Sequence, residues 1–242
     1  MTFGKIHISL VFLFLNGFYL GVSPLIAQTR VTTSIVQNTC IGDINPLIGS
    51  FYTPTAFKGL LGYNFGIEKN LDDNVTWLLE IGFGDFESTY SPARSDVSID
   101  SYHIPANDEK NPDRNSYRYI LGKYSNISFS LNWTFLEMSL FDVYLGLGLG
   151  IMEFNLSDLD GRNLKEVNIT RYINETVPRL TPIMPLTMGI TFFSGSSFTV
   201  VYETSWIFTN TDYLDNVGFY GNPDSDSIFR NQIRVRYQIF NK

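Results

Sequence analysis

Few side chains in this sequence have the types and spacing that acid–base or nucleophilic chemistry requires. The chain of 242 residues contains two histidines and one cysteine, Cys40. A single cysteine forms neither an internal disulfide nor a thiolate metal site. His103 lies in a polar stretch far from any expected strand end, so no rigid neighbour would orient it for a Ser–His–acid site. The sequence therefore predicts that the protein is not an enzyme and has no catalytic residues.

Metal and phosphate sites are poorly supported as well. The acidic segments 158–161 and 224–226 contain oxygen ligands that calcium prefers, but neither completes a ligand loop. Gly146, Gly148 and Gly150 lie in an expected strand and do not open a helix, as a phosphate-binding glycine loop does. We expect no metal ion, no cofactor and no small-molecule substrate.

The composition narrows the class of protein further. Aromatic residues make up 15% of the chain, with 20 Phe and 14 Tyr, while charged residues make up only 17%. This balance is unlike a disordered chain and unlike a soluble enzyme with many Lys- and Glu-rich helices. The formal net charge of −7 argues against nucleic-acid binding, because few cations are available for phosphates. The balance favours a β-protein with an aromatic surface.

The N-terminus has the features of a secretory signal peptide. Lys5 precedes an apolar stretch that ends near Ala27. An uncleaved membrane anchor is the alternative, but Asn16 and Pro24 interrupt the apolar run. We therefore expect residues 1–27 to be removed and residues 28–242 to form one exported domain. Beyond residue 28 no stretch approaches the roughly 20 apolar residues of a spanning helix.

The exported part alternates between apolar and polar residues with period two, the pattern of strands with one apolar face. In the segment 126–136, large apolar residues such as Phe129 and Trp133 alternate with Ser and Asn, and the other segments follow the same rule. Eight strands are expected, at 31–41, 61–68, 77–84, 126–136, 143–151, 186–192, 198–209 and 229–239.

The connections between these strands alternate between long and short. Short turns are expected near residues 70–74, 136–139 and 194–197, and long loops at 42–54, 88–115, 155–181 and 210–227. This asymmetry is typical of outer-membrane barrels. A soluble sandwich or lipocalin-like barrel also alternates, but eight strands would hardly enclose so many large residues. The sequence predicts an all-β, eight-stranded antiparallel up-and-down transmembrane β-barrel in the bacterial outer membrane, in contact with its lipids and lipopolysaccharide.

If the apolar faces meet lipid, several charged residues point into the barrel. Pairing Thr209 with Ile228 places Glu203 opposite Arg234, and an ion pair would lower the cost of burying both charges. Such a network would serve either as a gated ion path or as a polar plug, and the plug is favoured because eight-stranded barrels leave no aqueous channel. The expected lumen network comprises Glu80, Glu203, Arg230, Arg234 and Arg236.

Two loop segments carry a family resemblance. Residues 42–46 read Gly-Asp-Ile-Asn-Pro, and residues 211–217 read Thr-Asp-Tyr-Leu-Asp-Asn-Val. Together with the segments around Pro54–Phe65 and Ile81–Asp85, their order resembles that of the PorG-like outer-membrane barrels of the Bacteroidetes, which belong to the type IX secretion and gliding apparatus. The motif residues are Asp43, Asn45, Thr211, Asp212, Tyr213, Leu214 and Asp215.

The resemblance implies a non-enzymatic barrel that anchors a periplasmic ring, formed by a lipoprotein and its partner, at the outer membrane. The expected contact surface is the set of periplasmic turns, with Leu71, Asp72, Asp73, Glu137 and Ser196. The 212–217 segment is either a partner site or a loop that packs over the barrel mouth. A lipid-modifying barrel enzyme, and an adhesion or envelope-stability barrel acting through its loops, remain the alternatives.

Overall fold

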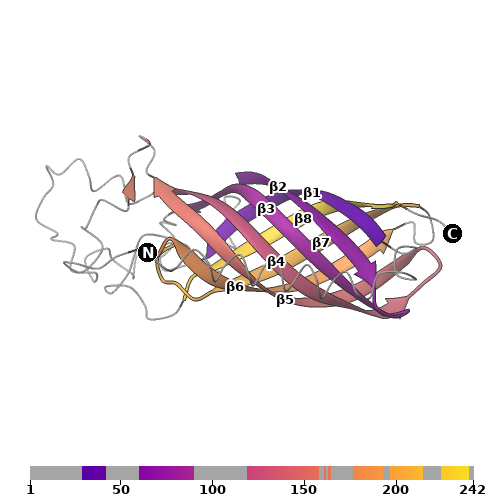
Figure 1. Cartoon of the computed structure of the whole chain (residues 1–242). Helices are drawn as coiled ribbons and strands as arrows, with labels where there is room; N and C mark the ends of the chain where they lie inside the picture. The colour runs from indigo at the N-terminus through magenta and orange to yellow at the C-terminus, as the bar shows by residue number, and fades with distance from the viewer. Residues whose placement is uncertain are drawn as a thin grey trace, which may run out of the picture.

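The protein is a closed barrel of eight antiparallel strands in a computed structural model, as the sequence predicted (Figure 1). The structure describes residues 29–41, 60–89, 119–157, 161, 163–164, 177–192, 197–214 and 225–239. The expected signal peptide lies outside these residues, as do His103 and most of the long loops. The strands are β1 (Thr29–Ile41), β2 (Leu60–Asn70), β3 (Val75–Thr89), β4 (Tyr119–Glu137), β5 (Phe141–Ser157), β6 (Leu180–Phe192), β7 (Phe198–Thr209) and β8 (Ser227–Gln238).

The first and last strands close the barrel, because β1 pairs with β8 as well as with β2. Following paired residues once around the barrel from Thr29 leads back to β1 at Thr39, ten residues further on (39 − 29 = 10). Such a stagger requires strongly tilted strands, and the strands wind obliquely around the barrel in Figure 1.

The strand ends that meet in short turns and those that lead into the long connections lie at opposite ends of the barrel. We call them the turn end, which holds residues 71–74 and 138–140, and the loop end, where Ile41, Leu60 and Thr209 lie. At the first turn, the Asp72 carboxylate accepts hydrogen bonds from the backbone N–H groups of Asn74 and Val75, at 2.9 and 2.7 Å. This local bond stabilises the tight reversal between β2 and β3. Ser196 lies outside the described residues.

The large apolar side chains of the middle of the barrel point outward. Phe129, Trp133 and Leu147 are 46%, 54% and 55% exposed, whereas Arg234 is 2% exposed. In water this arrangement would leave an apolar surface all around the molecule, but in a bilayer it is the required one. No helix among the described residues is both long and apolar enough to cross a membrane.

The two faces exchange polarity toward the loop end. On β5 the outward residues change from Leu149 and Ile151 to Glu153 and Asn155, while the inward residues become Met152, Phe154 and Leu156. Across the same region Asp85 of β3 pairs with Lys123 of β4, and Lys123 pairs with Asn155. A polar exterior around an apolar interior suits water, so β3, β4 and β5 emerge from the bilayer at this end.

This exchange explains why β4 and β5 are longer than expected. The sequence pattern predicted strands at 126–136 and 143–151, where the apolar residues share one face. The period of two continues to Tyr119 and Ser157, but the apolar residues move to the other face. The expectation of a polar inner face therefore holds for the middle of the barrel and is wrong near the loop end.

Inward glycines make room for large neighbours. A Cβ atom at Gly189 would collide with the ring of Tyr144 on the paired strand β5, and one at Gly122 would collide with the ring of Phe86. In an eight-stranded barrel the lumen is just wide enough for side chains, so a large residue on one strand requires a small one opposite.

Gly189→Ala is therefore expected to destabilise the barrel by about 1–3 kcal/mol through overpacking. The direction of this change in stability is informative, because Gly→Ala inside a strand normally stabilises a protein. Urea unfolding in phospholipid vesicles measures the effect. In a Tyr144→Ala background the added methyl group should be harmless, and an equal loss of stability there would contradict this explanation.

Candidate functional site

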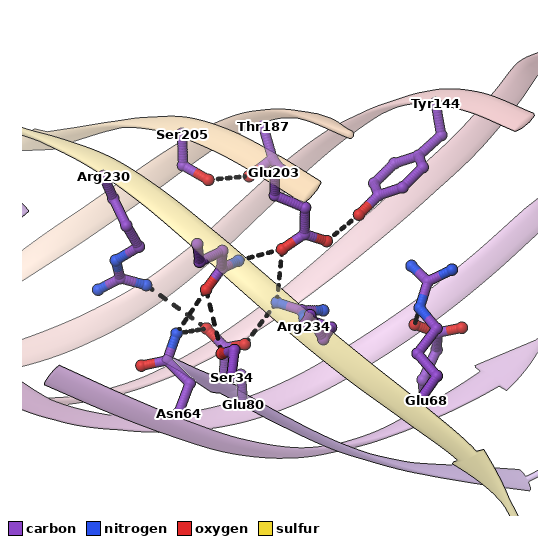
Figure 2. A network of polar contacts seen from close by, with 12 residues as sticks. Ser34, Asn64, Glu68, Glu80, Tyr144, Thr187, Glu203, Ser205, Arg230 and Arg234 are labelled. Atoms are coloured by element: carbon purple, nitrogen blue, oxygen red, sulfur yellow. Dashed lines mark hydrogen bonds and ion pairs between the residues drawn. The ribbon is translucent and has the colours of Figure 1, made fainter. Parts of the chain in front are cut away.

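The most concentrated polar chemistry in the described structure lies inside the barrel. Arg234 of β8 lies between two carboxylates, 2.6 Å from Glu80 of β3 and 3.0 Å from Glu203 of β7 (Figure 2). Arg230, two inward positions away on β8, lies 3.5 Å from Glu80. All four side chains are buried. The barrel thus brings together Glu80, Glu203, Arg230 and Arg234, four of the five residues of the expected network.

The fifth expected residue, Arg236, belongs to a second ion pair. Its guanidinium group lies 2.9 Å from the carboxylate of Glu68, which is fully buried, and Arg30 lies 2.9 Å from the same carboxylate. Sequence reasoning missed Glu68 as a member of the network. It does occupy an even position of β2, the same parity as the inward Asn64, and this signal would have found it.

Neutral side chains connect the charged groups. The amide of Asn64 donates to Glu80 and to Gln232, each at 2.9 Å. Gln232 and the hydroxyl of Tyr144 in turn donate to Glu203. In Figure 2, Tyr144 points toward Glu203, and Asn64 and Arg234 point toward Glu80. In this network the buried carboxylates of Glu68, Glu80 and Glu203 face the buried guanidinium groups of Arg230, Arg234 and Arg236, which avoids the large cost of an isolated buried charge.

The register behind the expected ion pair was wrong by two residues. Glu203 lies opposite Gln232, and Phe208 rather than Thr209 is the last residue of β7 that pairs with β8, with Ser227 as its partner. The Thr209 hydroxyl donates instead to the carbonyl of Asp226, at 2.6 Å. Glu203 and Arg234 still meet because an arginine side chain spans the diagonal distance to a neighbouring strand.

An apolar plug fills the lumen between the polar network and the loop end. Phe86, Ile120 and Phe154 pack together in a cluster with the single cysteine, Cys40, and all four are buried. Two leucines outside the strands, Leu164 and Leu214, also belong to this cluster. Sequence reasoning missed this plug, because a buried apolar face and a lipid-facing one show the same alternation.

Part of the family-motif segment belongs to this plug. Leu214 is fully buried, its backbone N–H donates to the Asp226 carboxylate at 2.7 Å, and Tyr213 packs against the same cluster. The backbone of Thr211 accepts a hydrogen bond from the N–H of Asp226. Asp212 lies beside them in the chain. This part of the segment packs over the barrel mouth, while Asp43, Asn45 and Asp215 lie outside the described residues.

The turn end is open. A polar cavity of about 560 Å³ extends from the turns toward Arg236 and Tyr144. Two of the turn residues singled out from the sequence, Asp73 and Glu137, line it, and Asp142 does so too. Leu71 and Asp72 are exposed at the adjacent turn, as is Leu140 in the next one. We call this cavity the turn-end funnel.

Between the funnel and the plug almost no space remains. The cavity in the middle of the lumen, lined by Glu80, Glu203 and Arg234, has a volume of about 20 Å³. A water molecule needs roughly 10–15 Å³ by this measure, so one or two waters would fill it. The lumen thus narrows from an open funnel to a filled core.

A single-channel recording in a planar bilayer is expected to show no steady open current from the wild-type protein, because the polar core and the apolar plug leave no continuous water path. A Phe86→Ala, Phe154→Ala variant, which thins only the plug, should remain closed because the core is intact. Steady wild-type currents would instead favour a gated ion path.

Among the described residues, no three His, Cys, Asp or Glu side chains cluster closely enough to hold a metal ion. The four charged groups at the centre of the lumen, Glu80, Glu203, Arg230 and Arg234, are ion-paired with one another, and the space between them is too small for an organic substrate. What the arrangement can do is hold the strands in one register and close the lumen.

Closure of all eight strands, the apolar exterior and the filled polar interior define a transmembrane β-barrel of the outer-membrane class. Neither a protein-family model nor a curated protein matches the sequence. Solved structures that resemble it include Neisserial surface protein A (9% identity, 87% of this chain and 97% of that chain, TM-score 0.49). Ail, the attachment invasion locus protein of Yersinia pestis, shares 11% identity over 87% of this chain and 97% of that one, with a TM-score of 0.44.

The outer membrane enzyme PagL is similar over 87% of this chain and 99% of that chain, with 10% identity and a TM-score of 0.35. These neighbours thus include an enzyme and proteins of other roles, at identities too low to favour any one of them.

Proposed function

We propose that this protein is a non-enzymatic anchor in the outer membrane, whose turn end holds a periplasmic assembly. The observation that supports this proposal best is the contrast between the two ends of the described barrel. The lumen is filled by an ion-paired core and an apolar plug, whereas the turn end presents an open funnel with exposed side chains around it. A barrel that is filled in this way offers surfaces rather than a passage.

The turn end has the mixed chemistry of a protein-binding surface. Leu140 is 77% exposed, Leu71 58% and Met138 49%, which is unusual for the tips of turns in water. Asp73, Glu137 and Asp142 add negative charge at the funnel, whereas Arg30 and Arg236, which also line it, are both paired with Glu68. A partner with apolar side chains and a basic extended segment would complement both features.

The resemblance of the two loop motifs to PorG-like barrels supplies the identity of the partner in this proposal. It would be the periplasmic ring of a type IX secretion and gliding apparatus, formed by a lipoprotein and its partner. In this arrangement the short turns face the periplasm, and the barrel transmits the position of the ring to the membrane.

Co-purification in mild detergent tests this proposal. The tagged wild-type barrel, produced in its own cells, is expected to bring down a periplasmic ring lipoprotein. A variant with Leu71→Ser, Leu140→Ser, Asp73→Asn and Glu137→Gln should recover at least tenfold less of it and should impair secretion. These residues are exposed or line the funnel, so the barrel itself should still form.

The matched control neutralises two acidic residues on the exterior near the loop end, Asp85→Asn and Glu153→Gln, and should keep the ring lipoprotein bound. Undiminished binding by the turn variant would contradict an anchor that acts through the turns. Loss of surface adhesion in the control, with secretion intact, would favour a barrel that acts through its loop end.

A further inference from the structure

The turn-end funnel has a positively charged floor. Arg30 of β1 and Arg236 of β8 both line it, and each lies 2.9 Å from a different oxygen of the Glu68 carboxylate. In the centre of the lumen, the two carboxylates of Glu80 and Glu203 face two guanidinium groups. At the floor, by contrast, two guanidinium groups share one carboxylate, and no other described carboxylate lies within ion-pair distance of either. The floor therefore carries one positive charge more than its ion pairs balance.

The floor also has hydrogen-bond donors that are not used. Arg236 is 6% exposed, its guanidinium group lies 5.3 Å from the ring centre of Tyr144, and one of its terminal nitrogens donates to the Thr191 hydroxyl at 3.1 Å. The other terminal nitrogen has no hydrogen-bond partner among the described residues, and neither has the hydroxyl of Thr199, which is 7% exposed and lines the funnel. Arg30 likewise uses only one terminal nitrogen. Guanidinium groups with free N–H donors suit a carboxylate, which they bind in a planar fork.

The mouth of the funnel is acidic. Asp142 lies one inward position closer to the turn end than Tyr144, and it is paired with Glu137 in the β4–β5 ladder. Both side chains line the funnel, and neither forms an ion pair with a described residue. Asp73 lines the same mouth from the first turn. Because like charges directly opposite each other destabilise a sheet, a cation bound between Glu137 and Asp142 would relieve their repulsion.

The order of these charges along the funnel selects the ligand. An isolated anion would have to pass the acidic mouth, and an isolated cation would leave the charge of the floor unbalanced. A ligand that enters with a negative group in front and a positive group behind it satisfies both levels. The C-terminal end of a polypeptide has this order when a lysine or arginine shortly precedes its last residue. The volume of about 560 Å³ is typical of pockets for small ligands, which is room for a chain end and not for a folded domain.

We propose that the turn-end funnel binds the C-terminal end of a partner polypeptide. The terminal carboxylate lies at Arg30 and Arg236, and a basic side chain of the same segment lies between Glu137 and Asp142. This inference rests on the proposed function, since it names the part of the periplasmic partner that the turn end holds. Charge-assisted hydrogen bonds give the contact its strength, and the opposite charges of floor and mouth fix the direction in which the segment enters.

Binding of synthetic peptides to the purified protein in phospholipid nanodiscs tests this site. The probes are hexapeptides of glycine and serine with a free C-terminal carboxylate, an N-terminal fluorescent label, and one lysine at the second, third or fourth position from the end. The best of them is expected to bind at least tenfold more tightly than the same peptide with a C-terminal amide, or with glutamine in place of lysine. Fluorescence anisotropy measures the affinities. Equal binding of the acid and the amide, or no binding of any peptide, would overturn the proposal.

Two variants separate the two ends of the site. Arg30→Gln leaves Glu68 paired with Arg236, so the barrel should keep its stability, but the preference for the carboxylate over the amide should fall at least tenfold. Asp142→Asn should instead reduce the preference for lysine over glutamine and keep that for the carboxylate. The matched control, Asp85→Asn on the exterior near the loop end, should bind like the wild type. If either funnel variant weakened all peptides alike, a distorted funnel would explain the loss and the assignment would be wrong.

These peptide measurements are independent of the ring lipoprotein. A wild-type protein that prefers the acid peptide but recovers no ring lipoprotein from its cells would refute the anchor and support the chain-end site. Recovery of the ring lipoprotein together with equal binding of acid and amide peptides would refute the chain-end site alone.

Discussion

Replacement of Arg234 by methionine is expected to destabilise the barrel by about 3–5 kcal/mol, because it leaves Glu203 buried without its cation and weakens the pairing of Glu80. Methionine has a similar length and no charge, so the loss reports on the electrostatic balance rather than on a large cavity. Urea unfolding in phospholipid vesicles, followed by tryptophan fluorescence, measures the change.

The control restores the charge balance of the lumen. Adding Glu203→Gln to the Arg234→Met variant leaves Glu80 with Arg230 and Glu68 with Arg236, so each remaining carboxylate again has a guanidinium partner. The double variant should therefore be more stable than the single one. If the two substitutions acted independently, their losses of stability would instead add. If the second substitution lowers stability further, unpaired charge is not the cause of the first loss.

The second large effect concerns the lipid face. Leu147→Arg is expected to destabilise the protein by about 2–4 kcal/mol, because it places a charge in the middle of the apolar belt. Asn155→Arg lies on the same strand and the same face, but beyond the point where the exterior becomes polar. There the cost should be about 0–1 kcal/mol, the range for positions near or outside the interface.

The same unfolding measurement compares the two variants directly. A large difference between positions 147 and 155 would place the border of the bilayer between them. Equal effects at both positions would show that the exchange of polarity on β5 does not mark that border.

The strand count, the closure and the outward direction of the large apolar residues followed from the sequence because each depends on local alternation. Phe129 and Trp133 share one parity, and only a lipid-facing surface accommodates so many residues of that size around eight strands. The polar direction of Arg234 and Glu203 followed from the same parity, since a side chain opposite a lipid-facing one must point inward.

The sequence did not predict which residues of the lumen contact one another. Alternation along a strand says whether a side chain points inward or outward, but not at which height along the barrel axis it lies. The β7–β8 register brings Thr209 beside Asp226, whose carbonyl accepts hydrogen bonds from the Thr209 hydroxyl and backbone N–H, and strand patterns do not contain these contacts. Glu68 belongs to the network because the tilt of the strands places it at the same height along the barrel axis as Arg236 on β8. Levels of this kind are set by the ten-residue stagger around the barrel, which is a property of the closed sheet.

By itself, then, the sequence determined a barrel of eight strands with its apolar side outward. Side-chain alternation is a local property, and the apolar face of a strand turns outward in hydrocarbon but inward in water. Only the tertiary structure decided which carboxylate meets which guanidinium and where an apolar plug closes the loop end. It also decided that Arg30 and Arg236 share one carboxylate at the floor of the turn-end funnel. These features require residues far apart in the chain to reach the same height, and that height exists only once the barrel has closed.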